Sequence, residues 1–422
     1  MSEKKKILVI SDHPLAPSGV GTQTRYFLEA LLKTGRYKFI CLGGAVKHES
    51  YDPQNITDPS WDDGDLVVYP VDGYGSPEAI RSLVWQEKPD LLWFMTDPRF
   101  YPWLWQIENE IRSVIPMVYY HVWDNYPPPK FNKKWYDSND VIASISKVTH
   151  DIVSKVSPDV ENHYLPHAVD SEVFRKLPDD VMDEFREENF PDHNGRFIFF
   201  WNNRNARRKS SGTLIHWFNK FAEEVGPEKV CLIMHTDPKD PNGQALEIIL
   251  RDFDINDGRV MFSRDKMPPH GLSLMYNMAD CTINISDAEG FGLATLESLS
   301  CGTPIVVTMT GGLQEQVTDG KDWFGIGIEP SAKAMIGSQN VPYIFEDRIS
   351  EEDFLQALRD MYNMSTEERN EMGEKGADYV RKNYNFELYN ERWINMIDDI
   401  CHRYGSWDTR KGYKSWTVKE VA

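Results

Sequence analysis

Short apolar runs alternate with helix-like patterns along the first half of the chain. An apolar run at 7–11 predicts a first strand, and apolar residues on one side of 22–32 predict a helix. Further strands are expected at 39–42, 66–71, 91–95, 117–121 and 141–145. Strands that alternate with helices usually form a parallel sheet, so this half is expected to be an α/β domain.

The alternation is interrupted once and then resumes. Residues 171–195 are polar, acidic and proline-bearing, and are interpreted as a linker. The chain from about 350 to 402 is predicted to be helical, and the residues from 405 onward are expected to be poorly ordered, with Trp407 and Trp416 as candidates for docking. The second series of strands is expected at 196–201, 229–235, 260–263, 281–285 and 305–308.

The pattern predicts two Rossmann-like α/β domains with parallel sheets that face each other across a cleft. A chain of 422 residues is too long for one ordinary core and suits two domains of this size. The expected boundaries give an N-terminal domain at 1–175, a C-terminal domain at 176–385, and a last helix and tail at 386–422.

Composition narrows the function classes. A net charge of −20 argues against a generic nucleic-acid or anionic-membrane surface, so no stable nucleic-acid binding is expected. The five cysteines are widely spaced and mostly within apolar runs, which fits reduced core residues better than disulfides or zinc ligands. No secretory signal or membrane span is recognised, and a cytoplasmic location is expected.

The most informative stretch runs from Ser286 to Thr308. It predicts a glycine loop, a short helix and a buried strand, with one glutamate in the loop (Glu289) and one on the helix (Glu297). Glu297 is expected on a face of apolar and small residues, where an unpaired charge is costly, so a polar group should reach it. The loop also offers backbone N–H groups at a helix N-terminus, which suit phosphate or sugar oxygens.

A second candidate stretch, 202–211, follows the strand expected at 196–201. It carries four basic side chains, Arg204, Arg207, Arg208 and Lys209, before the next predicted helix. Basic groups at the carboxyl end of a strand make a suitable anion site. A solvated basic turn remains the alternative for this stretch, and an ordinary ion pair or cap remains the alternative for Glu297.

The Glu289–Glu297 block resembles the donor-binding signature of the retaining glycosyltransferase family 4, which has the GT-B fold. The resemblance implies a transferase that moves a sugar from a UDP- or GDP-linked donor to an acceptor hydroxyl with retention, without metal or other cofactor. Glu289 would then hold hydroxyls of the sugar and Glu297 the ribose, within a donor site that includes Gly290, Phe291, Gly292 and Leu293.

The resemblance also assigns the diphosphate to Arg204 and Lys209, which have the spacing of the family. The chain departs from the family at Ser210, where a glycine usually follows the lysine, and in the extra Arg207 and Arg208. Either extra arginine could share or replace the phosphate role. Met267 lies near the segment that grips the base in the family.

Three features of the first domain are further candidates. The resemblance places Gly19 and Gly21 near the donor phosphate, although a tight turn alone would also explain these glycines. It makes His121 a catalytic candidate beneath the reacting sugar and Asp124 an acceptor contact, against the alternative of a packed histidine. Aromatic residues are dense at 93–136, which suggests stacking on a carbohydrate or glycolipid acceptor by Trp93, Trp103, Trp105, Trp123 and Trp135.

Other functions remain open at this stage. One is transfer of sugar to modified DNA bases, which the net charge disfavours. Others are an epimerase or phosphorylase of the same fold and a non-catalytic sugar-nucleotide-binding partner in glycan assembly. The aspartate pairs at 63/65 and 252/254 are interpreted as a surface turn and a helix end, so no metal site is predicted.

Overall fold

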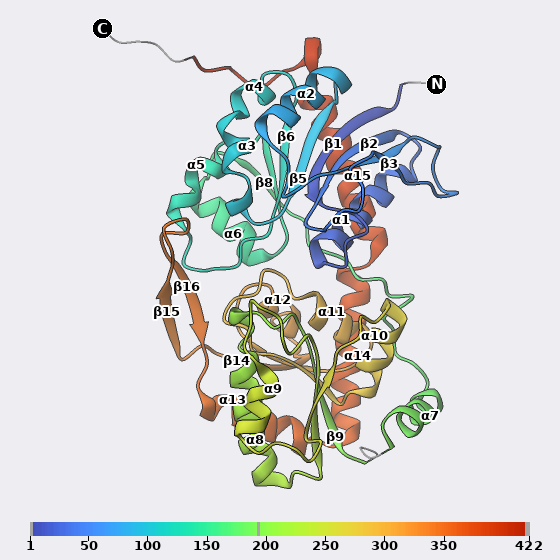
Figure 1. Cartoon of the computed structure of the whole chain (residues 1–422), viewed down its shortest axis with the longest axis vertical. Coiled ribbons are helices and arrows are strands. Elements are labelled where there is room, and N and C mark those ends of the chain that lie inside the picture. The colour runs from blue at the N-terminus through green and yellow to red at the C-terminus, as the bar shows by residue number, and fades with distance from the viewer. Residues whose placement is uncertain (1–2, 192–194, 418–422) are drawn as a thin grey trace. The chain divides into compact units, whose positions relative to one another are not determined.

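The structure is a computed structural model that describes residues 3–191 and 195–417. The chain folds into two compact units. The first comprises Met1–His167, Gly337–Tyr343 and Glu387–Ala422, and the second comprises Ala168–Ile336 and Ile344–Phe386. Each unit contains a parallel sheet with helices packed against it (Figure 1).

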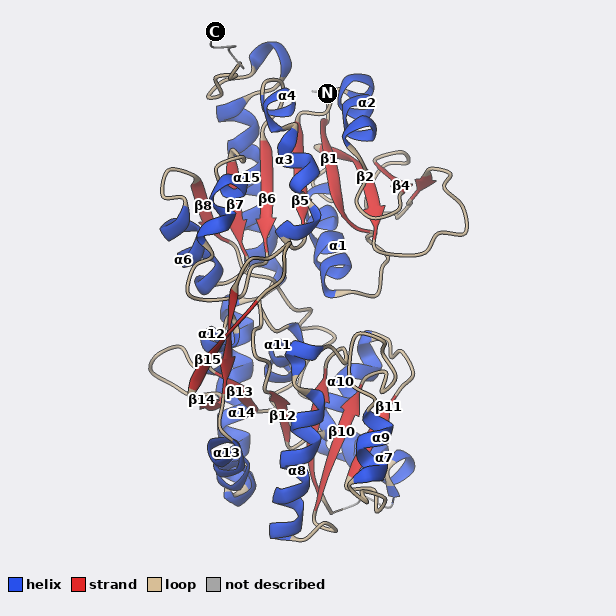
Figure 2. Ribbon diagram, turned by 60° about the vertical axis from the view of Figure 1, so that its left-hand side comes forward, coloured by secondary structure: helices blue, strands red, loops and turns tan. Residues whose placement is uncertain are grey.

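The first unit is built on an eight-stranded sheet in the order β3-β4-β2-β1-β5-β6-β7-β8. All neighbouring strands are parallel except β3 and β4, and Figure 2 shows the parallel run of β5, β6 and β7. The strands are β1 Lys5–Asp12, β2 Tyr37–Gly44, β3 Gln54–Asn55, β4 Leu66–Pro70, β5 Leu91–Met95, β6 Met117–His121, β7 Val141–Ser144 and β8 Glu161–Tyr164. The helices are α1 Gly19–Leu32, α2 Pro77–Glu87, α3 Pro102–Gln106, α4 Glu108–Arg112, α5 Lys133–Tyr136, α6 Lys147–Val156 and α15 Phe386–Tyr404.

The second unit is built on a six-stranded parallel sheet in the order β11-β10-β9-β12-β13-β14. A separate antiparallel hairpin, β15–β16, follows it. The strands are β9 Phe197–Asn202, β10 Val230–His235, β11 Val260–Ser263, β12 Cys281–Asn284, β13 Ile305–Thr308, β14 Gly325–Ile328, β15 Ala332–Ile336 and β16 Ile344–Arg348. The helices are α7 Asp179–Asn189, α8 Ser211–Val225, α9 Leu246–Asp252, α10 Pro269–Met278, α11 Leu293–Ser300, α12 Leu313–Val317, α13 Glu351–Asn363 and α14 Thr366–Asn383.

The strand order of the second sheet reverses between β9 and β12. The chain winds outward from β9 through β10 to β11, then returns to the other side of β9 and continues from β12 to β14. In such doubly wound sheets, the loops after the two central strands diverge and leave a crevice at their carboxyl ends, where ligands bind. The loops that follow β9 and β12 therefore have the position expected of a binding site.

Helix α15 belongs to the core of the first unit although it comes from the far end of the sequence. Its Trp393 is fully buried. The indole packs edge-on against Phe27 of α1, Trp93 of β5 and Tyr120 of β6, with ring centroids 4.8, 5.9 and 4.9 Å apart. Such aromatic pairs add favourable contacts beyond burial alone. The first sheet is thus completed by a helix that the chain forms last.

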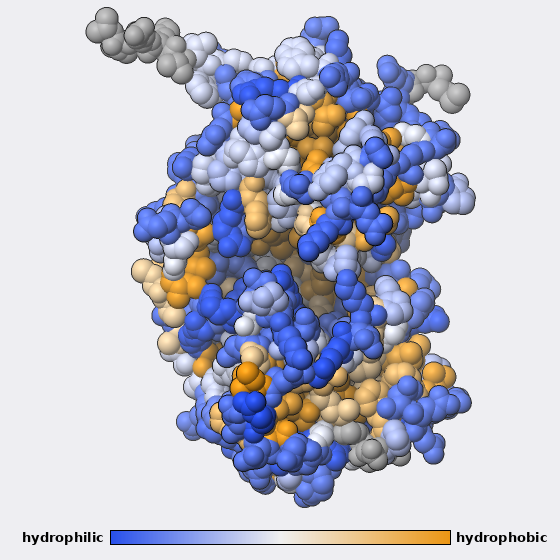
Figure 3. Space-filling view, in the orientation of Figure 1, coloured by the Kyte–Doolittle hydropathy of each residue, from blue (hydrophilic) through white to orange (hydrophobic). Residues whose placement is uncertain are grey.

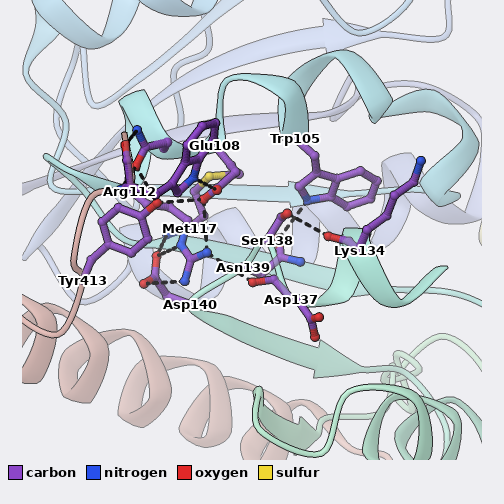
Figure 4. Close-up of polar contacts among 12 residues, drawn as sticks. Trp105, Glu108, Arg112, Met117, Lys134, Asp137, Ser138, Asn139, Asp140 and Tyr413 are labelled. Carbon is purple, nitrogen blue, oxygen red and sulfur yellow. Dashed lines mark hydrogen bonds and ion pairs between the residues drawn. The ribbon is translucent and has the colours of Figure 1, made fainter. Parts of the chain in front are cut away.

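The segment after α15 is docked on the first unit, and the expectation of poor order is wrong for residues 405–417. Arg410 forms an ion pair with the buried carboxylate of Asp140 (2.8 Å), to which Arg112 also donates (3.2 Å; Figure 4). The Tyr413 hydroxyl donates to Asn109 (2.9 Å), and the indole N–H of Trp407 donates to a backbone carbonyl at Pro89 (2.9 Å). The sequence named the two tryptophans but not Arg410.

The interpretation of 171–195 as a linker is also corrected, because α7 forms within it. This helix buries only Met182 and carries acidic residues in its first turn, so its sequence has the polarity of a loop. The hairpin β15–β16 was not predicted either. Of the five residues of β15, two are alanines, one is a lysine, and Met335 is exposed. The strand therefore lacks the continuous apolar run that identified the central strands.

The surface is mostly polar. Figure 3 shows hydrophilic residues over most of the visible face, with small apolar patches between them, in keeping with the acidic composition. Within the described part of the chain, no helix has both the length and the apolar character that crossing a membrane requires.

Substitution Trp393→Ala is expected to lower the free energy of unfolding by about 3–5 kcal/mol, because it removes a buried aromatic side chain from the centre of the first unit. Urea unfolding followed by circular dichroism measures the loss. The matched control is Trp416→Ala, whose side chain is 54% exposed and which should change stability by less than about 0.5 kcal/mol. Equal stability of the two variants would show that α15 contributes little to this core.

Candidate active site

The loop between β12 and α11 is held in one conformation by close backbone packing. Gly292 has φ +92°, and a Cβ atom there would lie 2.6 Å from the Leu313 side chain. Gly311 has φ +48°, and a Cβ there would overlap the backbone carbonyl of Glu289, while the Gly312 N–H donates to that same carbonyl (3.0 Å). Glycine is needed at both turns, so these residues fix the path of the chain around Glu289.

The carboxylate of Glu289 is buried and forms an ion pair with Lys209, which is also buried. Arg208 lies 3.8 Å from the second carboxylate oxygen, and Asn284 donates to the carboxylate from the end of β12 (3.5 Å). Burial alone would raise the pKa of Glu289, but the charges of Lys209 and Arg208 more than offset it and lower the pKa to about 2. Glu289 is therefore ionised at neutral pH.

The four basic side chains of the loop after β9 do not all form ion pairs with the same carboxylate. Arg204 is 65% exposed and pairs with Asp240 (2.6 Å), away from Glu289. Arg207 pairs with Glu346 on β16 (2.9 Å). Of the four, Lys209 and Arg208 are the two that form an ion pair with Glu289, so Arg208, and not Arg204, is the arginine beside the sugar-binding candidate.

Ser210 explains why the family pattern has a glycine after the lysine. Its φ is +54°, in the left-handed region that residues with a Cβ atom rarely adopt. The Ser210 hydroxyl donates to Asp287 (3.1 Å), which compensates part of the cost of this conformation. The basic loop is held further by Asn205, whose side chain bonds Ser211 and the backbone of Gln244 (2.6 and 2.7 Å).

Glu297 has a hydroxyl partner in place of a cation. The Tyr276 hydroxyl donates to its carboxylate (2.8 Å), and the same hydroxyl accepts a hydrogen bond from Asn202 at the end of β9 (2.8 Å). Burial raises the pKa of Glu297 to about 7, and the Tyr276 hydrogen bond acts in the opposite direction. The pKa values of the two glutamates thus shift in opposite directions, because burial dominates at Glu297 and the nearby cations dominate at Glu289.

A network of alternating charges connects the site to the hairpin. Arg348 of β16 forms ion pairs with Asp287 and with Glu346 (2.8 Å for Glu346), and Glu346 also receives Arg207. The sequence did not identify Glu346 or Arg348, because the hairpin carries no motif and its charges are scattered along the strand. A cavity of about 400 Å³ opens beside this network, and its lining includes Arg207, Ser210, Gln244, Asp287 and Arg348.

Three buried polar atoms near the carboxyl ends of the second sheet make no hydrogen bond to the described residues. They are the amide nitrogen of Asn203 after β9, the hydroxyl of Thr236 after β10 and the hydroxyl of Thr308 at the end of β13. Buried polar groups are nearly always satisfied in folded proteins, by protein, water or ligand. Their position at the edge where doubly wound sheets bind ligands is consistent with a polar ligand there.

The candidate residues of the first unit differ in how deeply they are buried. A Cβ atom on Gly21 would lie 2.7 Å from the carbonyl of Ala16, so packing alone requires this glycine, while Gly19 is exposed at the start of α1. His121 is fully buried, and its Nε2 is hydrogen-bonded to the Tyr136 hydroxyl (2.8 Å). Burial lowers the pKa of His121 to about 3, so this imidazole is neutral at physiological pH.

The remaining candidates have less defined surroundings. Asp124 is partly exposed in the loop after β6, and Met267 is partly exposed between β11 and α10. Trp93, Trp105 and Trp123 are buried, while Trp103 and Trp135 are partly exposed, so the five tryptophans at 93–136 cannot all stack on an acceptor. Among the residues that the structure describes, no group of three or more histidine, cysteine, aspartate or glutamate side chains is placed to hold a metal ion.

Comparison with known proteins agrees with this geometry. Residues 181–379 match the family model "Glycosyl transferases group 1". A D-inositol 3-phosphate glycosyltransferase of Acidothermus cellulolyticus is 41% identical over 78 residues, which are 18% of this chain and 17% of that protein. A trehalose synthase of Pyrococcus horikoshii is 22% identical over 192 residues, covering 44% and 40% of the two chains. The chain thus spans less than half the length of either relative.

Solved structures are similar over nearly the whole chain. Sucrose-phosphate synthase from Thermosynechococcus elongatus superposes with a TM-score of 0.74 at 16% identity, covering 94% of this chain and 100% of that one. Anabaena HepE in complex with UDP-glucose superposes with a TM-score of 0.67 at 13% identity, covering 93% and 99%. The predicted GT-B architecture is confirmed, and residues 181–379 are similar to the group 1 glycosyl transferases.

Proposed function

We propose that this protein is a retaining glycosyltransferase that moves a hexose from a nucleoside diphosphate sugar to an acceptor hydroxyl without a metal ion. The observation that carries the proposal is the buried Lys209–Glu289 ion pair, at the strand-order reversal between β9 and β12. A buried ion pair is costly to form and is not in itself a stabilising device. Such a pair suits a binding site, because an anionic group of a ligand can replace Glu289 beside Lys209, and sugar hydroxyls can replace Lys209 beside Glu289.

Different groups of the donor are expected to bind to the two members of this ion pair. Its diphosphate would take Lys209 and Arg208, whose cationic groups already lie together at the basic loop. Hydroxyls of the sugar would then donate to the freed Glu289 carboxylate. Glu297, which accepts a hydrogen bond from Tyr276, would accept others from the ribose. The related fold of HepE, solved with UDP and UDP-glucose, supports a nucleotide sugar as donor.

The geometry supports a front-face reaction. The bond between the anomeric carbon and the diphosphate oxygen breaks, and the acceptor oxygen forms a bond on the same face. The acceptor proton passes to the departing phosphate oxygen, so no protein base is required. Lys209 and Arg208 would stabilise the charge that develops on that oxygen. Glu289 would orient the sugar once the diphosphate has taken its two cations, and neutral His121 would not act as a proton donor.

Glu289→Gln is expected to lower the rate of sugar transfer by roughly 100-fold, because the neutral amide accepts hydrogen bonds from the sugar hydroxyls more weakly than the carboxylate does. Transfer is measured as nucleotide release with UDP- and GDP-sugars, and the anomeric configuration of the product by NMR. The variant leaves Lys209 without its carboxylate, so the double variant Lys209→Met/Glu289→Gln serves as the folding control. A folded Glu289→Gln protein with near-normal transfer would contradict the proposal, as would an inverted product.

The two arginines give a matched comparison for the diphosphate. Arg208→Ala is expected to remove most of the thermal stabilisation by UDP or GDP, which for wild type is about 2.7 kcal/mol at 100-fold excess over Kd. Arg204→Ala removes an equal charge from the same loop but breaks only the exposed pair with Asp240, and should keep most of that stabilisation. If Arg204→Ala loses the stabilisation and Arg208→Ala keeps it, the phosphate role belongs to Arg204. If both variants keep it, the diphosphate does not bind to this loop.

Glu297→Gln is expected to stabilise the protein relative to wild type at alkaline pH. The folded pKa of about 7 lies above the unfolded value, so the contribution of Glu297 is fully present below pH ~4.5 and is lost as pH rises through 7. The variant should match wild type near pH 4 and exceed it by roughly 1–3 kcal/mol above pH 8. Urea unfolding across this range tests it, with exposed Glu352→Gln on α13 as the control. A pH-independent difference would place the carboxylate in water.

A further inference from the structure

The hairpin β15–β16 forms a small sheet of its own, separate from the six-stranded sheet, and the proposed function gives it no role (Figure 1). Three consecutive residues of β16 nevertheless bond to the loops of the candidate donor site. They are Glu346, Asp347 and Arg348, which belong to the second unit as those loops do. The Glu346 side chain is 1% exposed. A buried carboxylate is strongly destabilising without its cationic partners, so the contact between β16 and the loops is closely constrained.

A series of side-chain contacts leaves the basic loop at Arg207 and returns to it at Ser210. Arg207 pairs with Glu346 (2.9 Å), which also pairs with Arg348 (2.8 Å). Arg348 pairs in turn with Asp287, and the Asp287 carboxylate accepts a hydrogen bond from the Ser210 hydroxyl (3.1 Å). The basic loop is thus attached to β16 on both sides of the two cations that the proposed function assigns to the diphosphate.

Backbone hydrogen bonds connect the same segments. The Asp347 N–H donates to the carbonyl of Asp287 (2.8 Å), and the Asp287 N–H donates to the carbonyl of Arg208 (2.8 Å). The Arg208 guanidinium donates to the carbonyl of Ala288, the residue before Glu289. A displacement of β16 would therefore move the loop of Arg208 and the loop of Glu289 together.

Arg348 is the residue on which this set of contacts depends. Its guanidinium bonds to two buried carboxylates, Glu346 and Asp287, whose side chains are 1% and 7% exposed. Without Arg348, Glu346 would keep its pair with Arg207, but Asp287 would lose the cation that bonds to it. Burial raises the pKa of Asp287, and the charge of Arg348 opposes that rise. An arginine suits this position because its fork of N–H donors reaches two carboxylates at once.

The same contacts account for two departures of the basic loop from the family pattern, Arg207 and Ser210. The arginine provides the first ion pair to β16, and the serine provides the hydroxyl that donates to Asp287. A glycine at position 210 would adopt the left-handed backbone (φ +54°) at lower cost but would offer no hydroxyl. Both departures therefore serve to attach the basic loop to the hairpin.

We propose that Arg348 is a positioning residue of the donor site. Through Asp287 and Glu346 it holds the basic loop in the arrangement in which this loop binds a diphosphate. The proposal rests on the proposed function and adds to it a residue that does not itself touch the donor. Cations that are already held in place lose less conformational freedom when an anion binds. Loss of Arg348 should therefore weaken nucleotide binding although the side chains that bind the diphosphate remain.

Calorimetric titration of the full chain with UDP and GDP tests the proposal. Arg348→Ala is expected to weaken binding of the preferred nucleotide by roughly 10-fold. Arg348→Lys should weaken it less, because an ammonium keeps the charge but not the fork. The matched control is Arg359→Ala, which should bind as wild type does. Arg359 belongs to the same unit, has similar exposure (32% against 38%) and forms a two-bond pair with Glu224 on α8 (2.7 Å for each bond).

Chemical rescue separates positioning from a general loss of structure. Arg348 and Asp287 line the cavity of about 400 Å³, so a guanidinium ion has access to the space that Arg348→Ala leaves. Guanidinium chloride, at concentrations far below those that unfold proteins, should restore most of the nucleotide affinity of this variant. Sodium chloride at equal ionic strength should not. Unchanged affinity in Arg348→Ala, or a loss that guanidinium does not restore, would overturn the proposal.

Hydrogen exchange of the nucleotide-free protein provides a readout that does not depend on donor binding. Arg348→Ala should exchange faster than wild type in residues 203–211 and 285–292, and Arg359→Ala should not. If wild type binds neither nucleotide, the donor site of the proposed function is rejected. Faster exchange in Arg348→Ala would then still show that Arg348 holds the two loops, and unchanged exchange would reject that role as well.

Discussion

The buried ion pair between Lys209 and Glu289 is the constraint on which the organisation of the second unit depends. Each charge alone would be strongly destabilising in this position, so the loops after β9 and β12 have to meet. The sheet topology makes this possible, because β9 and β12 are neighbours whose connections wind in opposite directions. Gly292, Gly311 and left-handed Ser210 provide the backbone turns that bring the two side chains together.

Most of the central strands could be predicted because they are buried on both faces. Strands β5, β6 and β13 have the predicted limits and are buried along their whole length. The edge strand β11 also has its predicted limits, although three of its four residues are only partly buried. The Glu289–Glu297 block could be found for a different reason. Its glycines and glutamates are spaced by local geometry, a loop followed by one short helix, which sequence encodes directly.

The rest depends on contacts between distant segments. The choice of Arg208 over Arg204 as the partner of Glu289 is made by Asp240, which holds Arg204 elsewhere and lies 36 residues away. The raised pKa of Glu297 is caused by burial, which no spacing rule reveals. The tail was misjudged because Asp140 and the Arg112 carbonyl, which bond to Arg410, come 270 and 298 residues earlier in the sequence.

The discontinuity of the first unit has a consequence for how the protein is made. Residues of the second unit are all synthesised before α15, so that unit can complete its core while the chain is still being translated. The first unit has to wait, because Trp393 fills the centre of a core whose other members were made at the beginning. The side chains that Trp393 covers, among them Trp93 of β5 and Tyr120 of β6, stay without this cover until α15 is synthesised, which reverses the usual N-terminal-first order of domain folding. The earliest part of the chain is therefore the last to become resistant to aggregation and proteolysis.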